Sequence, residues 1–202
     1  MNKKFLLSLA VCLLASSAFA ETRTYSCGEN CTATIDDDYV MRIFGTGAMD
    51  DYQDFGVGTT YTTSPWSDER ARVKTVIVED GITYLGQSAF RGFSSLKDIE
   101  IAGSVETVGA GSFDEIRPQR LSMSDTTLWL NQDDMYDLQN LTVYCKGNYS
   151  TCKQNFLKNS PKLNQHANEI KFERSQGKKI YTVEEATKAS KATGNRFKIR
   201  YK

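Results

Sequence analysis

An internal repeat with a period of 23 residues constrains the fold of this chain more than any other feature of its sequence. The apolar positions of the first copy are Val76, Val78, Ile82, Leu85, Phe90 and Phe93. Their counterparts 23 positions later are Ile99, Ile101, Val105, Val108, Phe113 and Ile116. A period of this length is typical of a solenoid, in which each repeat buries its apolar edge by stacking on the next repeat. We therefore predict an array that presents surfaces to other molecules, with Phe90 and Phe113 buried and stacked one repeat apart.

The first twenty residues have the pattern of a secretory signal peptide. A charged start, an apolar segment and a small-residue cleavage pattern follow one another at Lys3-Lys4, Phe5–Leu14 and Ala18–Ala20. The apolar segment has ten residues, too few to span a bilayer, which disfavours a retained membrane anchor. A lipid-modified Cys12 is also disfavoured, because the residue before it is not small. We expect an exported chain that begins at Glu21, has no transmembrane segment after cleavage, and resides in the periplasm, at the cell surface or outside the cell.

The four cysteines that follow the signal peptide form two close pairs, Cys27/Cys31 and Cys145/Cys152. In an exported protein an even number of cysteines indicates disulfide bonds. Four cysteines allow three connectivities, and bonding within each close pair is the most economical of them. A zinc site is the alternative, but Cys-x3-Cys and Cys-x6-Cys are not the usual close-set zinc spacings. We therefore expect two local disulfides and no metal.

Charge divides the chain into two unequal parts. Residues 21–145 contain 9 basic and 21 acidic side chains, whereas residues 146–202 contain 14 basic and 4 acidic ones. So sharp a change indicates a change of domain or of role. Together with the repeat it predicts four regions: a signal peptide (1–20), an N-terminal β cap (21–72), the repeat array (73–145) and a small basic α+β C-terminal segment (146–202).

Each repeat is expected to begin with a short strand of alternating β-branched residues, at 76–78 and 99–101, with weaker copies at 121–123 and 141–143. Short helical or 3₁₀ segments are expected around 89–90 and 112–113. In the cap, residues 39–44 are predicted to form a strand, and Trp66 is expected to be a packing residue. In the basic segment we predict a helical turn at 154–159, a strand at 169–173, a helix from 183 to about 192 and an edge strand at 197–201.

Residues 81–90 (Gly-Ile-Thr-Tyr-Leu-Gly-Gln-Ser-Ala-Phe) and 104–113 (Ser-Val-Glu-Thr-Val-Gly-Ala-Gly-Ser-Phe) share one pattern, which resembles the BspA-like leucine-rich repeats of bacteria. The chain departs from that family at 101–103, where Ile-Ala-Gly stands for the common Ile-Pro. It departs again at Phe93 and Ile116, where the family commonly has cysteine. The resemblance implies an α/β repeat fold, a short leucine-rich-repeat-like solenoid with parallel strands. It also implies an exported or surface protein linked with adhesion or protein binding, with no catalytic residue and no cofactor.

Few residues outside the repeat have the pattern of a chemical site. His166 stands in a polar stretch without a recognisable nucleophile or carboxylate pattern, so it is expected at the surface. The acidic runs at 36–38, 50–51 and 133–134 lack the spaced oxygen ligands and glycine of a calcium loop. We interpret them as solvated loop carboxylates, and we expect no catalytic site.

Non-enzymatic binding of a protein or glycan partner, at the bacterial envelope or outside the cell, is the function that these features favour. If alternate strand residues point inward, Ile77, Glu100, Ser122 and Thr142 form one outward column, the candidate binding face. A solvated face without a partner explains this short, mixed column equally well. The alternative function is a structural envelope protein, anchored to an anionic surface by its basic C-terminal segment. That segment could instead pack against the acidic array, and no nucleic-acid partner is expected for an exported chain.

Overall fold

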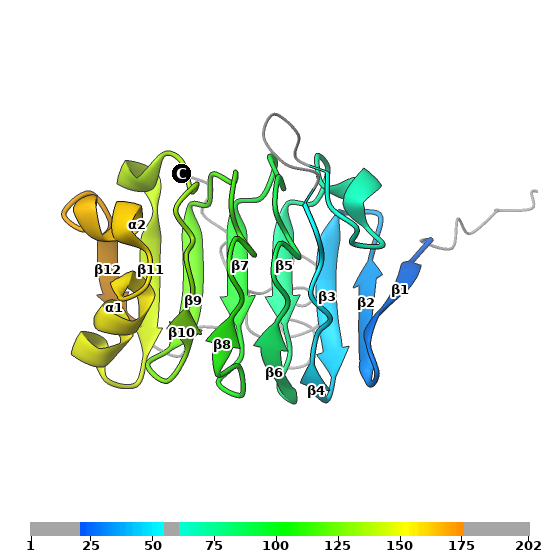
Figure 1. The fold of residues 1–202 in the computed structure, drawn as a ribbon, viewed down its shortest axis with the longest axis horizontal. Coiled ribbons are helices and arrows are strands. Elements are labelled where there is room, and N and C mark those ends of the chain that lie inside the picture. Colours follow the sequence, from blue (N-terminus) through cyan, green and yellow to red (C-terminus); the bar gives the residue numbers. More distant parts are fainter. Residues whose placement is uncertain (1–20, 55–60, 176–202) are drawn as a thin grey trace, which may run out of the picture.

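The computed structural model describes residues 21–54 and 61–175. They form an elongated molecule built around one long sheet, with shorter strands and turns on one side of it (Figure 1). The signal peptide, the helix predicted at 183–192 and the strand predicted at 197–201 lie outside the described residues.

The long sheet has eight strands in the order β1-β2-β3-β5-β7-β9-β11-β12. It begins with three antiparallel strands, β1 (Arg23–Gly28), β2 (Cys31–Ile35) and β3 (Val40–Gly45). Five strands then continue it in parallel, β5 (Thr75–Val78), β7 (Asp98–Ile101), β9 (Arg120–Ser124), β11 (Thr142–Lys146) and β12 (Lys171–Arg174). The strands predicted at 76–78, 99–101 and 121–123 lie inside β5, β7 and β9. Parallel pairing sets equivalent residues of successive repeats side by side, as the repeat predicts.

A second sheet of four short parallel strands lies across the core from the first. It consists of β4 (Gly47–Ala48), β6 (Ile82–Leu85), β8 (Thr107–Val108) and β10 (Leu128–Trp129), in the order β10-β8-β6-β4. These strands were not predicted, because strands of two to four residues are too short for an alternating pattern to be recognised.

The segments around 89–90 and 112–113 are turns, which corrects the prediction of short helices. Ser88 has a positive φ of 54°, which interrupts any helical run. The N–H of Phe90 donates to the carbonyl of Ser112 at 2.8 Å, so this donor bonds the next repeat instead of its own. The turns therefore form a third hydrogen-bonded side of the solenoid.

Four short helices complete the described part of the chain: η1 (Ser67–Glu69), η2 (Leu138–Asn140), α1 (Tyr149–Leu157) and α2 (Pro161–Gln165). The helix α1 starts earlier than the predicted turn at 154–159. Asn148 is its N-cap, and its side chain accepts the N–H of Thr151 at 3.0 Å. Both α helices lie beside β11 and β12 at one end of the long sheet (Figure 1).

The core is a set of columns that run through consecutive strands. One column consists of the fully buried and register-paired Met41, Val76, Ile99, Leu121 and Val143. An aromatic column runs parallel to it, with 4.8 to 6.2 Å between neighbouring ring centroids, through Trp66, Phe90, Phe113, Trp129 and Phe156. Phe90 and Phe113 stack at 4.8 Å and are fully buried, as predicted. Trp66 is a packing residue as expected, and its indole N–H donates to the carbonyl of Ala89 at 2.8 Å.

Two disulfide bonds lie near opposite ends of the long sheet. Cys27 is bonded to Cys31 across the β1–β2 connection, and Cys145 of β11 is bonded to Cys152 of α1. The second bond ties a helix to the strand that it covers, so it holds the C-terminal elements on the sheet.

Candidate binding surfaces

The outward face of the long sheet presents its side chains in rows that cross the strands. The middle row runs across all eight strands through Thr24, Thr34, Arg42, Ile77, Glu100, Ser122, Tyr144 and Glu173. A second row runs beside it through Val40, Thr75, Asp98, Arg120, Thr142 and Lys171. We call this side of the sheet the outward face. Besides the two rows it carries Ser26, Thr32, Phe44 and Lys146, each two positions from a row residue on the same strand.

Three of the four predicted face residues lie in one row, and the fourth does not. Ile77, Glu100 and Ser122 are aligned in the middle row, but Ser122 pairs with Tyr144, while Thr142 pairs with Arg120 in the second row. The prediction aligned Leu141 with Leu121, whereas the structure pairs Val143 with Leu121. The predicted register of this strand was therefore wrong by two residues. Leu141 instead lies before β11 as the C-cap of η2, where its N–H donates to the carbonyl of Leu138, the first residue of that helix.

Two ion pairs lie on the outward face near its centre. Arg120 meets Asp98 at 2.6 Å, and Lys146 lies 3.9 Å from Glu100. Ile77 and Ser122 are only 8% and 7% exposed, so neighbouring side chains cover most of the surface of these two residues at the centre of the middle row. A face whose charges are already paired favours a partner without strong net charge.

The N-terminal end of the outward face is rich in hydroxyl groups and carries an exposed aromatic ring. Thr24 pairs with Thr34, Ser26 pairs with Thr32, and Thr32 pairs in turn with Phe44. Phe44 is 38% exposed. Hydroxyl groups both donate and accept hydrogen bonds, and an aromatic ring adds flat apolar contact area.

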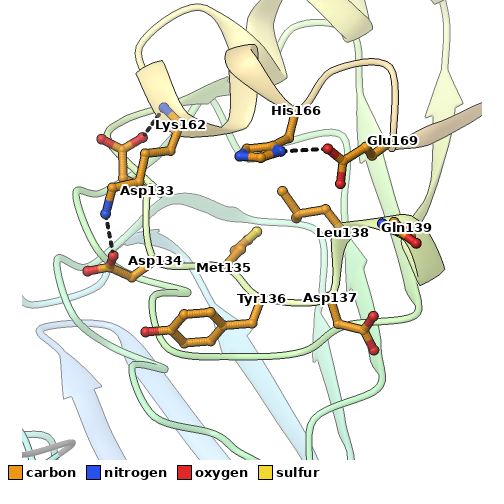
Figure 2. Close-up of a pocket in the computed structure, with 10 residues that line it drawn as sticks. All are labelled: Asp133, Asp134, Met135, Tyr136, Asp137, Leu138, Gln139, Lys162, His166 and Glu169. Carbon is orange, nitrogen blue, oxygen red and sulfur yellow. Dashed lines mark hydrogen bonds and ion pairs between the residues drawn. The ribbon is translucent and has the colours of Figure 1, made fainter.

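A second candidate surface is a hollow of about 430 Å³ between the loop that precedes η2 and the region of α2. We call it the C-terminal hollow. The ten residues that line it are Asp133, Asp134, Met135, Tyr136, Asp137, Leu138, Gln139, Lys162, His166 and Glu169 (Figure 2). Met135 and Leu138 are nearly buried and form an apolar floor, whereas Tyr136 is 47% exposed.

Polar contacts connect the two walls of the hollow. The ammonium group of Lys162 lies 2.7 Å from Asp134, and the backbone N–H of Lys162 donates to Asp133 at 3.0 Å. Hydrogen bonding to Asp134 raises the pKa of Lys162. On the other side, Nδ1 of His166 lies 2.7 Å from the carboxylate of Glu169, as Figure 2 shows.

These contacts refine two predictions made from sequence. His166 is exposed, as expected, but a carboxylate stands beside it that sequence reasoning did not connect to it. The His-x-x-Glu spacing was the signal that could have suggested the pair. Asp133 and Asp134, interpreted as solvated loop carboxylates, instead hold the first turn of α2 on the loop. Within the residues described, no group of three or more metal-ligating side chains is placed to hold an ion.

A buried glutamine positions the loop that forms one wall of the hollow. Gln132 is fully buried, and its side-chain oxygen accepts the N–H of Phe113 at 2.8 Å. Its side-chain nitrogen donates to the carbonyl of Gly109 at 2.6 Å, and its own N–H donates to Ser160 at 2.8 Å. The glutamine thus joins the last regular turn of the array to the segment that precedes α2.

The comparison with protein families decides the classification of this repeat. The family model described as "BspA type Leucine rich repeat region" matches residues 68–180 with six copies. The chain belongs to this family. The resemblance stated from residues 81–90 and 104–113 is thereby confirmed, and the BspA-type match extends past residue 145 into the segment that begins the basic part of the chain.

A leucine-rich repeat protein from Eubacterium ventriosum is similar to this BspA-type chain in structure. The two are 20% identical, with a TM-score of 0.45, and the alignment covers 66% of this chain and 45% of the other. This chain therefore spans less than half the length of that protein. No curated protein matches this chain. None of the helices among the described residues is long and apolar enough to cross a membrane.

Proposed function

We propose that this BspA-type repeat protein is a non-enzymatic binding protein of the bacterial envelope or exterior, and that it holds a protein or glycan partner on its outward face. The observation that carries the proposal is the outward face itself: its middle row continues across all eight strands, it is rich in hydroxyl groups at its N-terminal end, and Arg120 and Glu100 on it are paired with Asp98 and Lys146. Repeat proteins commonly use such an extended strand face for recognition. Proteins of this family are generally non-enzymatic scaffolds, and they are typically exported or surface proteins.

The same proposal assigns residues 21–72 the role of an end cap. Solenoids need an atypical terminal unit to cover their apolar end. Tyr25 and Tyr52 pack edge-on against Trp66, which itself stacks on Phe90 of the first repeat. These contacts support a cap that closes the aromatic column on the N-terminal side.

The test of the binding face uses an array of neutral and acidic bacterial glycans together with the chain that starts at Glu21. We expect binding to neutral glycans, weakened about tenfold by Phe44→Ser combined with Tyr144→Ser, because both rings belong to strands of the outward face. Tyr136→Ser, which removes an exposed ring elsewhere, is the matched control. Equal glycan binding by the unmodified chain, the double variant and the Tyr136→Ser control would contradict a binding role for the outward face.

An anchoring role is the second candidate, and one observation favours it. Lys153 and Lys158 of the α1 region line a hollow of about 630 Å³ together with Gln154 and Asn164. Anionic phospholipid vesicles should sediment with the chain, and Lys153→Gln with Lys158→Gln should reduce that binding because fewer cations face the vesicle surface. Equal sedimentation with zwitterionic vesicles would argue against this role.

A further inference from the structure

We propose that two copies of this chain pair through the open edge of strand β1 and thereby join their outward faces into one continuous surface. The pairing itself is independent of the function proposed above. Its consequence, a binding face shared by two copies, rests on that function.

Strand β1 forms one end of the long sheet, so one of its two sides has no neighbouring strand (Figure 1). The β2–β3 ladder shows which backbone groups lie on that side. The N–H of Asp36 donates to the carbonyl of Val40, and the N–H of Thr46 donates to the carbonyl of Asn30. In an antiparallel ladder such bonded pairs alternate along the strand. The even-numbered residues of β2 therefore bond β3, and its odd-numbered residues bond β1.

Two residues of β1 consequently direct their backbone groups to the open side. The odd-numbered residues of β2 pair with Arg23 and Tyr25, which make the β1–β2 ladder. Thr24 and Ser26 alternate with them, and both are exposed. No other segment within residues 21–54 and 61–175 forms a hydrogen bond with the backbone of these two residues. A row of free donors and acceptors is a template for a further strand.

The opposite edge of the sheet, strand β12, is protected in ways that β1 is not. Three of the four residues of β12 are charged, as its sequence Lys-Phe-Glu-Arg shows. The carbonyl of Phe172 accepts the hydroxyl of Tyr149 at 3.2 Å. Charged side chains and a covered carbonyl discourage the addition of a strand. By contrast, residues 22–28 contain no proline and one charged side chain, Arg23, which is already paired with Glu69 at 2.9 Å.

A second copy of β1 fits this edge because the edge is complementary to itself. In antiparallel pairing about a two-fold axis, Thr24 lies opposite the second copy's Thr24, and Ser26 lies opposite the second copy's Thr22. Thr22 continues the alternation of Thr24 and Ser26, so each facing pair exchanges two backbone hydrogen bonds. Arg23 lies opposite the second copy's Tyr25, so no like charges meet along the strand. Isologous two-fold pairing is also the commonest form of self-association.

This register makes the middle row of the outward face continuous through the axis. Thr24 and Thr34 are neighbours in that row, so pairing sets them beside the second copy's Thr24 and Thr34. The hydroxyl-rich end of each molecule becomes the centre of the joined face. A repetitive neutral glycan that crosses the axis contacts both copies, and binding by two linked sites is tighter than binding by one.

The first test is a disulfide across the axis, formed by mild oxidation of the chain that starts at Glu21 with Thr24→Cys. Facing Cα atoms of a bonded antiparallel pair lie about 5.5 Å apart, within the range of a disulfide. We expect a covalent dimer on a non-reducing gel. The matched control is Thr34→Cys, in the same row but one strand further from the axis. Three strand spacings of about 4.8 Å separate the two copies of that residue, too far for a bond.

The second test is analytical ultracentrifugation over a range of protein concentration. One strand pair is smaller than a standard interface, so we expect a weak dimer whose apparent mass doubles as concentration rises. Thr24→Pro removes an N–H from the open edge but none from the β1–β2 ladder, so this variant should stay monomeric with an unchanged urea midpoint. Arg174→Pro, the equivalent change at the β12 edge, should dimerise like the unmodified chain.

Three results would overturn the pairing: a monomer at every concentration, equal crosslinking of Thr34→Cys, or a Thr24→Pro variant that still dimerises. If Thr24→Pro fails to fold, the crosslinking result decides. The double variant Phe44→Ser with Tyr144→Ser should dimerise like the unmodified chain. A dimer that binds no glycan would contradict the function proposed above and leave the pairing intact, whereas a monomer that binds glycans would do the reverse.

Discussion

At the scale of single residues, one buried carboxyl group stands out among the turns of the solenoid. Asp114 is only 8% exposed, although its side chain is a carboxyl group. It lies in the turn after Phe113, near the acidic side chains of Asp133 and Asp134. Burial raises the pKa of Asp114 to about 6, and repulsion from Asp134 adds to that effect. The N–H of Asp134 and the nearby Arg91 oppose the shift without cancelling it. Asp114 is therefore a residue at which the fold tolerates an unfavourable charge.

Replacing Asp114 by asparagine should stabilise the protein at pH 7 by about 2 kcal/mol. The folded state binds the Asp114 proton more tightly than the unfolded state, so the stability that this group contributes is present below about pH 4. It is lost as pH rises through about 6. Asparagine keeps the oxygen that accepts from Asp134 but carries no charge. Urea unfolding at pH 4 and pH 7 should show a gain that grows with pH, and a variant less stable than its parent at pH 7 would contradict this account.

At the scale of elements, the stacked repeats share one aromatic column rather than separate cores. Phe113 lies between Phe90 and Trp129, with ring centroids 4.8 and 5.6 Å away. Each ring therefore packs against the repeat before and the repeat after it. Such nearest-neighbour packing makes the stability of a solenoid a sum of repeat and interface contributions.

Replacing Phe113 by alanine should cost about 3–5 kcal/mol, because it removes a fully buried ring from the middle of the column and leaves a cavity. The matched control is Phe44→Ala, whose ring is 38% exposed and should cost less than about 1 kcal/mol. Urea unfolding of both variants measures the difference. Similar losses of unfolding free energy in the two variants would show that the aromatic column does not stabilise the contacts between repeats.

At the scale of the whole molecule, the two disulfides constrain opposite ends of an elongated fold. Cys27–Cys31 lies in the antiparallel start of the long sheet, and Cys145–Cys152 lies where α1 meets β11. An elongated array exposes its ends more than a compact domain does, so covalent closure there restrains fraying.

Non-reducing peptide mapping of the exported protein should recover two linked pairs, Cys27 with Cys31 and Cys145 with Cys152. Replacing Cys145 and Cys152 together by serine should cost about 2–3 kcal/mol, because a short loop is no longer closed in the unfolded chain. Replacing Cys27 and Cys31 together by serine measures the same loss of unfolding free energy at the N-terminal end of the long sheet. Free thiols, or a peptide that links the two pairs, would contradict local pairing.

The amino-acid sequence by itself determined the periodic part of this protein. The spacing of 23 residues that relates Val76 to Ile99 and Phe90 to Phe113 predicted parallel strands, a continuous core and stacked rings. A repeat allows this because each copy places the same residue types in the same local environment. Tertiary structure alone decided what breaks the period. Tyr144 rather than Thr142 pairs with Ser122, because the 3₁₀ helix η2 occupies residues 138–140 and β11 begins only after it. The two walls of the C-terminal hollow are joined by Asp133, which accepts the N–H of Lys162, 29 positions along the chain. Contacts of that kind form once in the fold and leave no periodic signal in the sequence.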